Sequence, residues 1–320
     1  MRSTSAGALR AAALVLMGAC AAQTALAAAP MAKTQAPGFY RMTLGDFEIT
    51  ALSDGTVDLP VDKLLHQKAD KTNKALARAF VKAPLETSVN AYLINTGSKL
   101  VLVDTGAAGL FGPTLGKLAA NLQAAGYQPA QVDEIYITHL HPDHAGGLTA
   151  DGKMAFPNAT VRMEKHDADF WLSKVNMEKA PAAQKGYFQN AIGALAPYAD
   201  VNRMQTFEGN AELAPGIKAV AAFGHTPGHS IYMVESRGQK LALVGDIVHV
   251  QAVQFDDPAV TIDFDSDSKA AAVQRKATFA EAAKQGYLIA AAHLPFPGIG
   301  RLRATGNTYQ FVPVNYSVPR

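Results

Sequence analysis

The sequence predicts a layered α/β domain, and three observations support this prediction. Short apolar runs typical of strands alternate with longer segments typical of helices, which is the pattern of sheets packed against helices. Two similar strand endings, residues 99–104 and 240–246, lie in the two halves of the chain. No linker rich in Gly, Ser or Pro divides residues 28–320, so we expect a single domain there. Chance similarity between two short strands is the alternative explanation of the repeat.

The expected elements follow from the hydrophobic pattern and the turn residues. Short apolar runs bounded by polar or turn-forming residues are typical of buried strands. Strands are expected at residues 89–95, 99–103, 219–223, 230–235, 241–244 and 287–292. Helices are expected at residues 113–125, 167–173, 182–195 and 268–285. We interpret residues 165–198 as an insertion that covers a substrate pocket.

The segment 139–144, His-Leu-His-Pro-Asp-His, concentrates metal-binding side chains in one short loop. Imidazole nitrogens and carboxylate oxygens are ligands that zinc prefers, and alternate side chains of one loop can face two different ions. The segment therefore indicates a dinuclear metal site. A solvated, histidine-rich loop is the alternative for such a motif taken alone.

Further candidate ligands follow other predicted strands. His229 ends the turn-rich segment Gly-His-Thr-Pro-Gly-His that begins at Gly224. Asp246 follows the strand at 241–244, and His293 follows the strand at 287–292. A carboxylate just past a buried strand is well placed to bridge two cations, so these residues are expected to complete the site.

Together these motifs resemble the metallo-β-lactamase superfamily, over essentially the whole chain after the first residues. The resemblance implies a four-layer αβ/βα sandwich with the metals at one edge, between the two sheets. It also implies two divalent ions, with zinc expected and manganese, cobalt or iron possible. The implied ligands are His139, His141 and His229 on one ion, Asp143, His144 and His293 on the other, and Asp246 as the bridge.

Departures from parts of the superfamily narrow the expected activity. The β-lactamases proper lack a bridging aspartate and commonly use a cysteine ligand, whereas this chain has Asp246 and no cysteine after Cys20. Antibiotic hydrolysis is therefore disfavoured. The flavodiiron branch has glutamate where this chain has His141, so a redox diiron role is disfavoured as well.

A closer resemblance is to the branch that contains methyl parathion hydrolase and related secreted lactonases, including dihydrocoumarin hydrolases. It rests on segments such as 44–55, 84–88, 100–115, 254–258 and 293–300. Phe111, Trp171 and Phe188 match positions that line an aromatic substrate pocket in this branch. The alternative is that these three residues are ordinary core aromatics.

Four further positions differ from the organophosphate-degrading member of that branch. The resemblance places Arg, Leu, Thr and Leu there, where this chain has Leu64, His249, Ile262 and Phe264. A tetrahedral phosphotriester needs more room than a flat lactone fused to an arene. We therefore expect hydrolysis of aryl lactones or esters, with weak phosphotriesterase side activity. A phosphotriesterase, an acyl-homoserine lactonase and a noncatalytic metal-binding protein are the alternatives.

The expected chemistry uses a hydroxide shared by two metals as the nucleophile and a metal that polarises the carbonyl. Asp143 is a candidate proton shuttle to the leaving oxygen. Asp104 and His225 are candidates for orienting a metal-bound imidazole through its second nitrogen. A helix N-cap or turn is the alternative role for Asp104.

The N-terminus predicts export. Arg2 and Arg10 precede an apolar stretch at 11–19, and Ala25-Leu-Ala27 resembles a signal peptidase site, so residues 1–27 are expected to be a signal peptide. Periplasmic or secreted localisation follows, and lipoprotein processing at Cys20 is the alternative. Without this segment the chain has 27 basic and 27 acidic residues, which gives no electrostatic argument for nucleic-acid or membrane partners, and neither is expected. A homodimer is expected from the resemblance alone.

Overall fold

The computed structural model describes residues 29–318, and the expected signal peptide, residues 1–27, lies outside the described residues. The chain divides into two units, Met1–Ala36 and Pro37–Arg320. Every helix and strand named below belongs to the second unit. Its longer strands form two seven-stranded sheets, one from each half of the sequence.

The first sheet has the strand order β1-β2-β3-β4-β5-β8-β9. Strands β1 to β4 are antiparallel neighbours, and β4, β5, β8 and β9 run parallel to one another. The strands predicted at residues 89–95 and 99–103 are confirmed as parts of β3 and β4, which pair with each other. The bounds are β1 Phe39–Leu44, β2 Phe47–Leu59, β3 Leu85–Asn95, β4 Leu100–Val103, β5 Glu134–Tyr136, β8 Thr160–Glu164 and β9 Met204–Phe207.

The second sheet has the order β10-β11-β12-β13-β14-β15-β16, in which only β13 and β14 are parallel neighbours. The β12–β13 hairpin and the parallel β13–β14 pair repeat the β3–β4–β5 arrangement of the first sheet. The bounds are β10 Ala211–Ala214, β11 Ile217–Ala221, β12 Ser230–Ser236, β13 Gln239–Gly245, β14 Leu288–Ala291, β15 Ile299–Thr305 and β16 Thr308–Pro313. The short pair β6 (Thr149–Ala150) and β7 (Lys153–Met154) stands apart.

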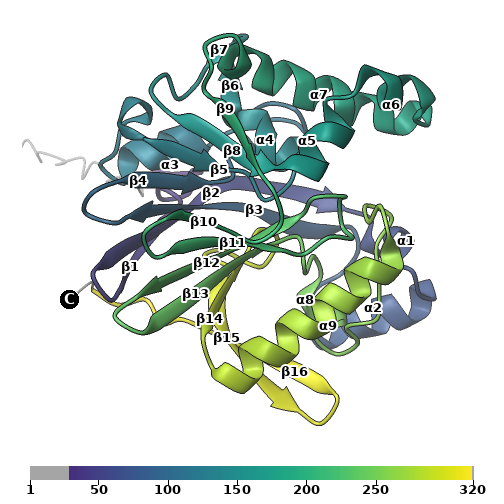
Figure 1. Ribbon diagram of the computed structural model, residues 1–320. Helices are drawn as coiled ribbons and strands as arrows, with labels where there is room; N and C mark the ends of the chain where they lie inside the picture. Colours follow the sequence, from purple (N-terminus) through teal and green to yellow (C-terminus); the bar gives the residue numbers. More distant parts are fainter. Residues whose placement is uncertain (1–28, 319–320) are drawn as a thin grey trace, which may run out of the picture. The chain divides into compact units, whose positions relative to one another are not determined.

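The helices flank the two sheets (Figure 1). The longer ones are α2 Ala69–Arg78, α3 Leu118–Ala124, α5 Lys165–Trp171, α6 Lys174–Lys179, α7 Ala182–Ala199 and α9 Ser268–Gln285. Shorter helical turns are α1 Val61–Leu64, α4 Pro142–Ala145, α8 Gln251–Gln254, η1 Pro129–Gln131 and η2 Gly146–Leu148. Among the described residues, no helix combines the length and the apolar character that crossing a bilayer requires.

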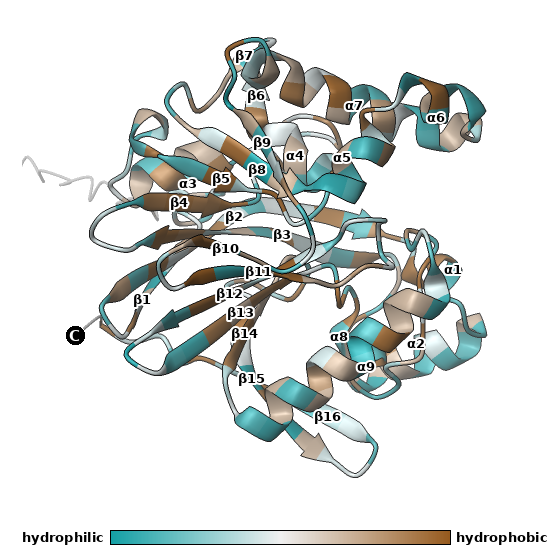
Figure 2. Cartoon of the chain, in the orientation of Figure 1, coloured by the Kyte–Doolittle hydropathy of each residue, from teal (hydrophilic) through white to brown (hydrophobic). Residues whose placement is uncertain are grey.

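Three apolar cores separate four layers, and this confirms the predicted αβ/βα sandwich. One core lies between the sheets, with Tyr92 and Val101 facing Tyr232 and Leu243. A second packs the outer face of the first sheet against α3, α5 and α7, and a third packs the second sheet against α9. The brown, hydrophobic strands in Figure 2 lie inside these layers, and the outer helices carry teal surfaces.

The predicted helices are present with shifted ends. The helix at 268–285 has the predicted bounds, because the Asp267 carboxylate caps its first amides and Gly286 adopts the left-handed conformation after its last turn. The helix at 182 continues to Ala199. The prediction of a helix at 113–125 is wrong in its first part, because the observed helix α3 begins at Leu118. The Asp54 carboxylate accepts the amide hydrogens of Gly116 and Leu118 and holds the preceding segment as a turn.

The sandwich brings one end of several strands to a common edge. Strand β5 leads to the loop 137–141, β13 ends before Asp246, and β14 ends before His293. Hairpin β11–β12 presents the loop 222–229 beside them, since Ser230 donates its amide hydrogen to the Thr138 carbonyl. Residues far apart in the sequence therefore meet at this edge.

Candidate metal centre

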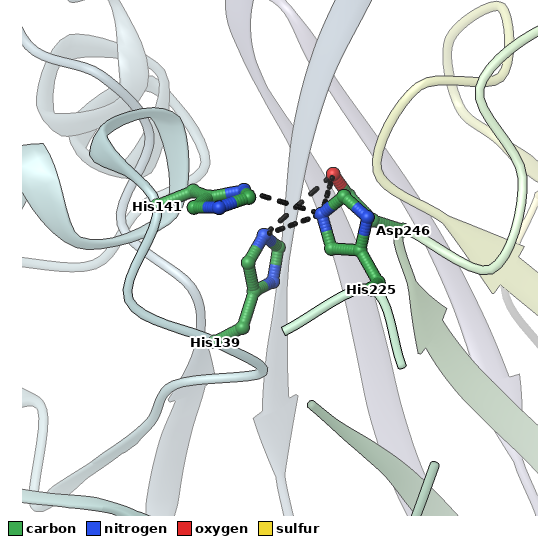
Figure 3. Close-up of side chains that lie close together, drawn as sticks. All are labelled: His139, His141, His225 and Asp246. Atoms are coloured by element: carbon green, nitrogen blue, oxygen red, sulfur yellow. Dashed lines mark hydrogen bonds and ion pairs between the residues drawn. The ribbon is translucent and has the colours of Figure 1, made fainter. Parts of the chain in front are cut away.

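Four buried side chains from three loops converge on one point (Figure 3). Nε2 of His225 lies 3.2 Å from Nε2 of His139, 3.2 Å from Nδ1 of His141 and 3.2 Å from Oδ2 of Asp246. Nε2 of His139 lies 3.6 Å from the same Asp246 oxygen. Three imidazole nitrogens and one carboxylate oxygen thus lie close enough together to hold a single cation.

A second group adjoins the first through Asp246. Nε2 of His293 lies 3.4 Å from Oδ2 of Asp143 and 3.2 Å from Oδ2 of Asp246. Nε2 of His144 lies 3.6 Å from Oδ2 of Asp143 and 3.1 Å from Oδ1 of Asp246. Asp246 therefore contacts both groups, as expected of a bridging carboxylate.

The structure corrects the assignment of His229. Its Nε2 accepts a hydrogen bond from the backbone N–H of Asp246, at 3.1 Å, so this nitrogen holds the loop before Asp246. His225 lies in the group where the sequence assigned His229. The two residues lie in the same loop, and the available signal was the position of His225 soon after β11, at the edge where the other strands end.

Buried acceptors orient the imidazoles from behind. Nδ1 of His144 lies 2.8 Å from Oδ2 of Asp104, whose other oxygen accepts the Thr138 amide hydrogen. Asp104 has a φ of 61°, and it contacts His144 rather than capping a helix. Nδ1 of His293 lies 2.9 Å from the Ser88 carbonyl oxygen. Such contacts select the tautomer that leaves the opposite nitrogen free for a metal.

The orienting partner of His225 is Asp265, which sequence reasoning missed. Their Nδ1 and Oδ1 atoms lie 2.9 Å apart, and both side chains are buried. The second oxygen of Asp265 accepts the Ile262 amide hydrogen, and the Arg275 guanidinium lies 3.8 Å from it. Asp265 follows no predicted strand and belongs to no recognised motif, so no signal in the sequence marked it.

The buried imidazoles fall into two groups, those whose pKa is lowered and those whose pKa is raised. Burial, with the nearby His225, lowers the pKa of His229 to about 3, and burial lowers the pKa values of His139 and His141. Burial alone also lowers the pKa of His225, but hydrogen bonds and charges of Asp246 and Asp265 outweigh it and raise the value to about 9. The carboxylates thus favour positive charge at the centre of the cluster.

Two buried atoms show that this cluster suits a cation. Nε2 of His144 and Oδ1 of Asp246 have no hydrogen-bond partner among the described residues, although they lie 3.1 Å apart. Buried polar atoms are rarely left unpaired, and those that are unpaired commonly mark an ion or a water. The donor set of imidazoles and carboxylates also fits a divalent metal such as zinc.

A pocket of about 90 Å³ opens above the cluster. His141, Asp143, Asp246 and His293 form its floor. Its walls are Val57, Leu59, Val89, Phe111, Tyr187, His249 and Phe264. The predicted pocket residues Phe111, His249 and Phe264 therefore face the site, and Tyr187 is a wall residue that sequence reasoning missed.

The other predicted pocket residues lie elsewhere. Phe188 is buried in the core under the first sheet, because residue 187 and not 188 of α7 faces the pocket. Trp171 is buried against the His141 ring, 5.2 Å between centroids, and supports the ligand from outside the pocket. Leu64 and Ile262 pack in the core formed with α2, so their influence on a substrate would be indirect.

A family model described as the metallo-beta-lactamase superfamily matches residues 85–293. The chain belongs to this superfamily. The matched range contains both groups of candidate ligands, and the superfamily sandwich agrees with the observed layers. Within this superfamily the chain is a metal-dependent hydrolase.

Related proteins include lactonases. A solved hydrolase of the beta-lactamase superfamily, AbOPH, is 40% identical with a TM-score of 0.85, and the match covers 89% of this chain and all of that one. AidC, a dizinc quorum-quenching lactonase solved with the product N-hexanoyl-L-homoserine, is 25% identical with a TM-score of 0.81, over 88% of this chain and 99% of AidC. An N-acyl homoserine lactonase of Bacillus cereus is 25% identical over 60% of this chain and 76% of its own length.

Proposed function

We propose that this superfamily member hydrolyses lactones or esters with the aid of two divalent metal ions, zinc being expected. The observation that carries the proposal is the small apolar pocket directly above a cluster of seven buried or half-buried imidazoles and carboxylates. The proposed ligands are His139, His141 and His225 for one ion, Asp143, His144 and His293 for the other, and Asp246 between them. Metal ions bound there supply Lewis acidity, which polarises a carbonyl group and lets water act as a nucleophile at neutral pH.

The protein's own residues would place the substrate and exclude water. Phe111, Tyr187 and Phe264 offer aromatic walls for a flat ring, and Val57 of β2 and Val89 of β3 add aliphatic lining. Asp143 is the more exposed carboxylate of the cluster, 22% against 4% for Asp246. Its Oδ2 is therefore the proposed carrier of a proton to the leaving oxygen.

The preferred substrates of the proposal are aryl lactones and esters of the dihydrocoumarin type. The pocket of about 90 Å³ is smaller than the roughly 150 Å³ cavity that holds benzene in another protein, so it would enclose only part of a fused bicycle, and a flat ring is favoured over a branched group. A phosphotriester with two alkoxy arms and an aryl group is bulkier. We also propose that the chain belongs to the methyl parathion hydrolase branch and has weak phosphotriesterase activity.

A second cavity favours N-acyl homoserine lactones as the other candidate substrates. It measures about 300 Å³ and shares His249 and His293 with the pocket above the metal cluster. Leu76, Val81 and Leu85 give it an apolar lining. An acyl chain could be buried there, and two of the relatives are acyl-homoserine lactonases by name or bound product.

The test compares kcat/KM of the metal-loaded protein for dihydrocoumarin, N-hexanoyl homoserine lactone and methyl parathion. A preference of at least about a hundredfold for either lactone over methyl parathion, equivalent to ~2.7 kcal/mol of transition-state stabilisation, supports the lactonase proposal. The ratio between the two lactones decides between aryl and acyl substrates. A preference for methyl parathion would contradict the proposal and assign a phosphotriesterase.

We also propose that the protein acts in the periplasm or outside the cell, on the basis of residues 1–27. N-terminal sequencing of the protein recovered from the periplasm of a bacterial host would test this. A start near residue 28 supports removal of a signal peptide. Recovery of the intact chain in the cytoplasm would contradict it, and a lipid on Cys20 would favour the lipoprotein alternative.

A further inference from the structure

Asp167 connects the two loops that carry the candidate ligands of the first metal. Its Oδ2 accepts the backbone N–H of Leu140 at 2.7 Å, and its Oδ1 accepts the backbone N–H of Gly228 at 2.7 Å. Leu140 lies between His139 and His141, and Gly228 lies in the loop of His225. One carboxylate therefore connects the loop of His139 with the loop of His225, two residues that lie 86 positions apart in the sequence.

The fit around this carboxylate is close. Asp167 lies in the first turn of α5 and is 1% exposed. Gly228 lies directly on that turn, where a Cβ atom would collide with the backbone nitrogen of Asp167 and the carboxylate of Glu164. Leu140 is fully buried in the core. Neither loop can move at these two residues without breaking a short hydrogen bond or opening the core.

Packing alone does not explain this residue, because burial of a carboxylate costs desolvation free energy. No lysine, arginine or histidine among the described residues forms an ion pair with Asp167. Burial raises its pKa to about 6, against the opposing effects of the Thr226 side chain and of the two backbone N–H groups. An apolar side chain of similar size would fill the same volume without this desolvation cost. The position is therefore explained by the two amides that the carboxylate holds.

We propose that Asp167 is a positioning residue that locks the loop of His139 and His141 against the loop of His225 and so fixes the first metal site before the metal binds. This inference rests on the ligand set of the proposed function. Trp171 of the same helix contacts the His141 ring, so α5 supports the site at two points. Asp167 acts through the backbone amides of Leu140 and Gly228, so the imidazole nitrogens of the ligands stay free for the metal.

The decisive variant is Asp167→Asn, with Asp169→Asn as the matched control. The amide has a single acceptor oxygen and would turn its NH2 group toward one of the two backbone N–H donors. Asp169 lies on the same helix but is exposed and pairs with Lys165. Zn²⁺ affinity is measured by competition with a chelator, and the Co²⁺ form is compared by its visible spectrum. We expect Asp167→Asn to lower the Zn²⁺ affinity of one of the two sites about 10- to 100-fold and to change the visible spectrum of the Co²⁺ form. Asp169→Asn should have the Zn²⁺ affinity and the Co²⁺ spectrum of the wild type.

A folded Asp167→Asn protein with Zn²⁺ affinity within about twofold of the wild type and an unchanged Co²⁺ spectrum would overturn the inference, even if its melting temperature fell. The wild type provides a second measurement that needs no variant. The Leu140 and Gly228 amides should remain protected from hydrogen exchange after the metal is removed. Loss of protection at both amides on metal removal would mean that the metal, and not Asp167, organises the loops.

The failure of this inference can be told from the failure of the proposed function. A wild-type protein that binds no Zn²⁺ would overturn both. A wild type that binds two Zn²⁺ ions but hydrolyses no lactone or ester would remove the proposed function while Asp167→Asn still tests the lock. Rescue of affinity by Asp167→Glu, relative to Asp167→Asn, would support the requirement for two carboxylate acceptors.

Discussion

Nδ1 of His225 lies 2.9 Å from Oδ1 of Asp265, while Nε2 of the same ring faces Asp246 at 3.2 Å. The imidazole is thus held between a carboxylate that orients it and the carboxylate of the metal cluster. The first prediction concerns this contact. Asp265→Asn should weaken Zn²⁺ binding about 10- to 100-fold, because the ring loses the partner that selects its tautomer.

Chelator competition measures the effect, with Asp263→Asn as the control. Asp263 is two residues away, is 54% exposed and pairs with His66 at the surface. Equal Zn²⁺ affinity of the Asp265 variant, the control and the wild type would show that His225 needs no carboxylate behind it.

The second prediction separates the two histidines of the 224–229 loop. His225→Ala should lower the bound metal, measured by elemental analysis after dialysis, because its Nε2 belongs to the ligand group. His229→Ala should keep the metal content but lower stability by about 1–3 kcal/mol, since the buried Asp246 amide loses its acceptor. The reverse pattern would restore His229 as the ligand.

The third prediction concerns substrate choice at His249. This ring lines the pocket, lies 3.0 Å from Oδ2 of Asp246 and stacks on His293. His249→Leu should raise turnover of methyl parathion relative to dihydrocoumarin, because it removes a polar ring from the pocket wall. His66→Leu, at an exposed histidine, is the control. An unchanged ratio of the two kcat/KM values would remove His249 from the specificity argument.

The fourth prediction distinguishes neighbouring aromatic residues of α7. Tyr187→Ala should lower kcat/KM for aryl lactones with little loss of stability, because Tyr187 lines the pocket and is half-buried. Phe188→Ala should cost about 3–5 kcal/mol of unfolding free energy, because Phe188 is 1% exposed in the core. Denaturant unfolding and steady-state kinetics on both variants test this. Equal kinetic effects with equal stability would mean that both side chains reach the substrate.

The fifth prediction is the pH dependence of the metal-free protein. The low pKa values of His229, about 3, and His249, about 4, keep these rings neutral in the fold, so stability falls as pH drops below the unfolded value of ~6.5. The pKa of His225, about 9, is raised, so its contribution is complete below ~6.5 and is lost as pH rises toward 9. The melting temperature of chelator-treated protein should therefore peak near pH 6.5. A steady rise from pH 5 to pH 9 would contradict this.

Much of the fold could be predicted because local pattern and layer packing agree. The runs at 100–103 and 241–244 are apolar throughout, and such strands must be covered on both faces, which requires the helices and the second sheet. The Asp267 cap and Gly286 likewise set the ends of α9 locally. By contrast, Asp54 decides where α3 begins through hydrogen bonds to a segment more than 60 positions away, and no local pattern records that contact.

By itself the sequence determined the layered α/β class, and its resemblance to the superfamily implied the four-layer sandwich and most of the candidate ligand set, whose members follow strands that end at one edge of the fold. Only the tertiary structure decided between His225 and His229, since both imidazoles lie in one loop and the direction of each depends on Asp246 and Asp265. It likewise decided that Tyr187, and not Phe188, faces the pocket, because neighbouring positions on a helix point about 100° apart. The Asp167 contacts also come from tertiary structure, since a carboxylate that accepts backbone amides leaves no signature in the side chains that it holds.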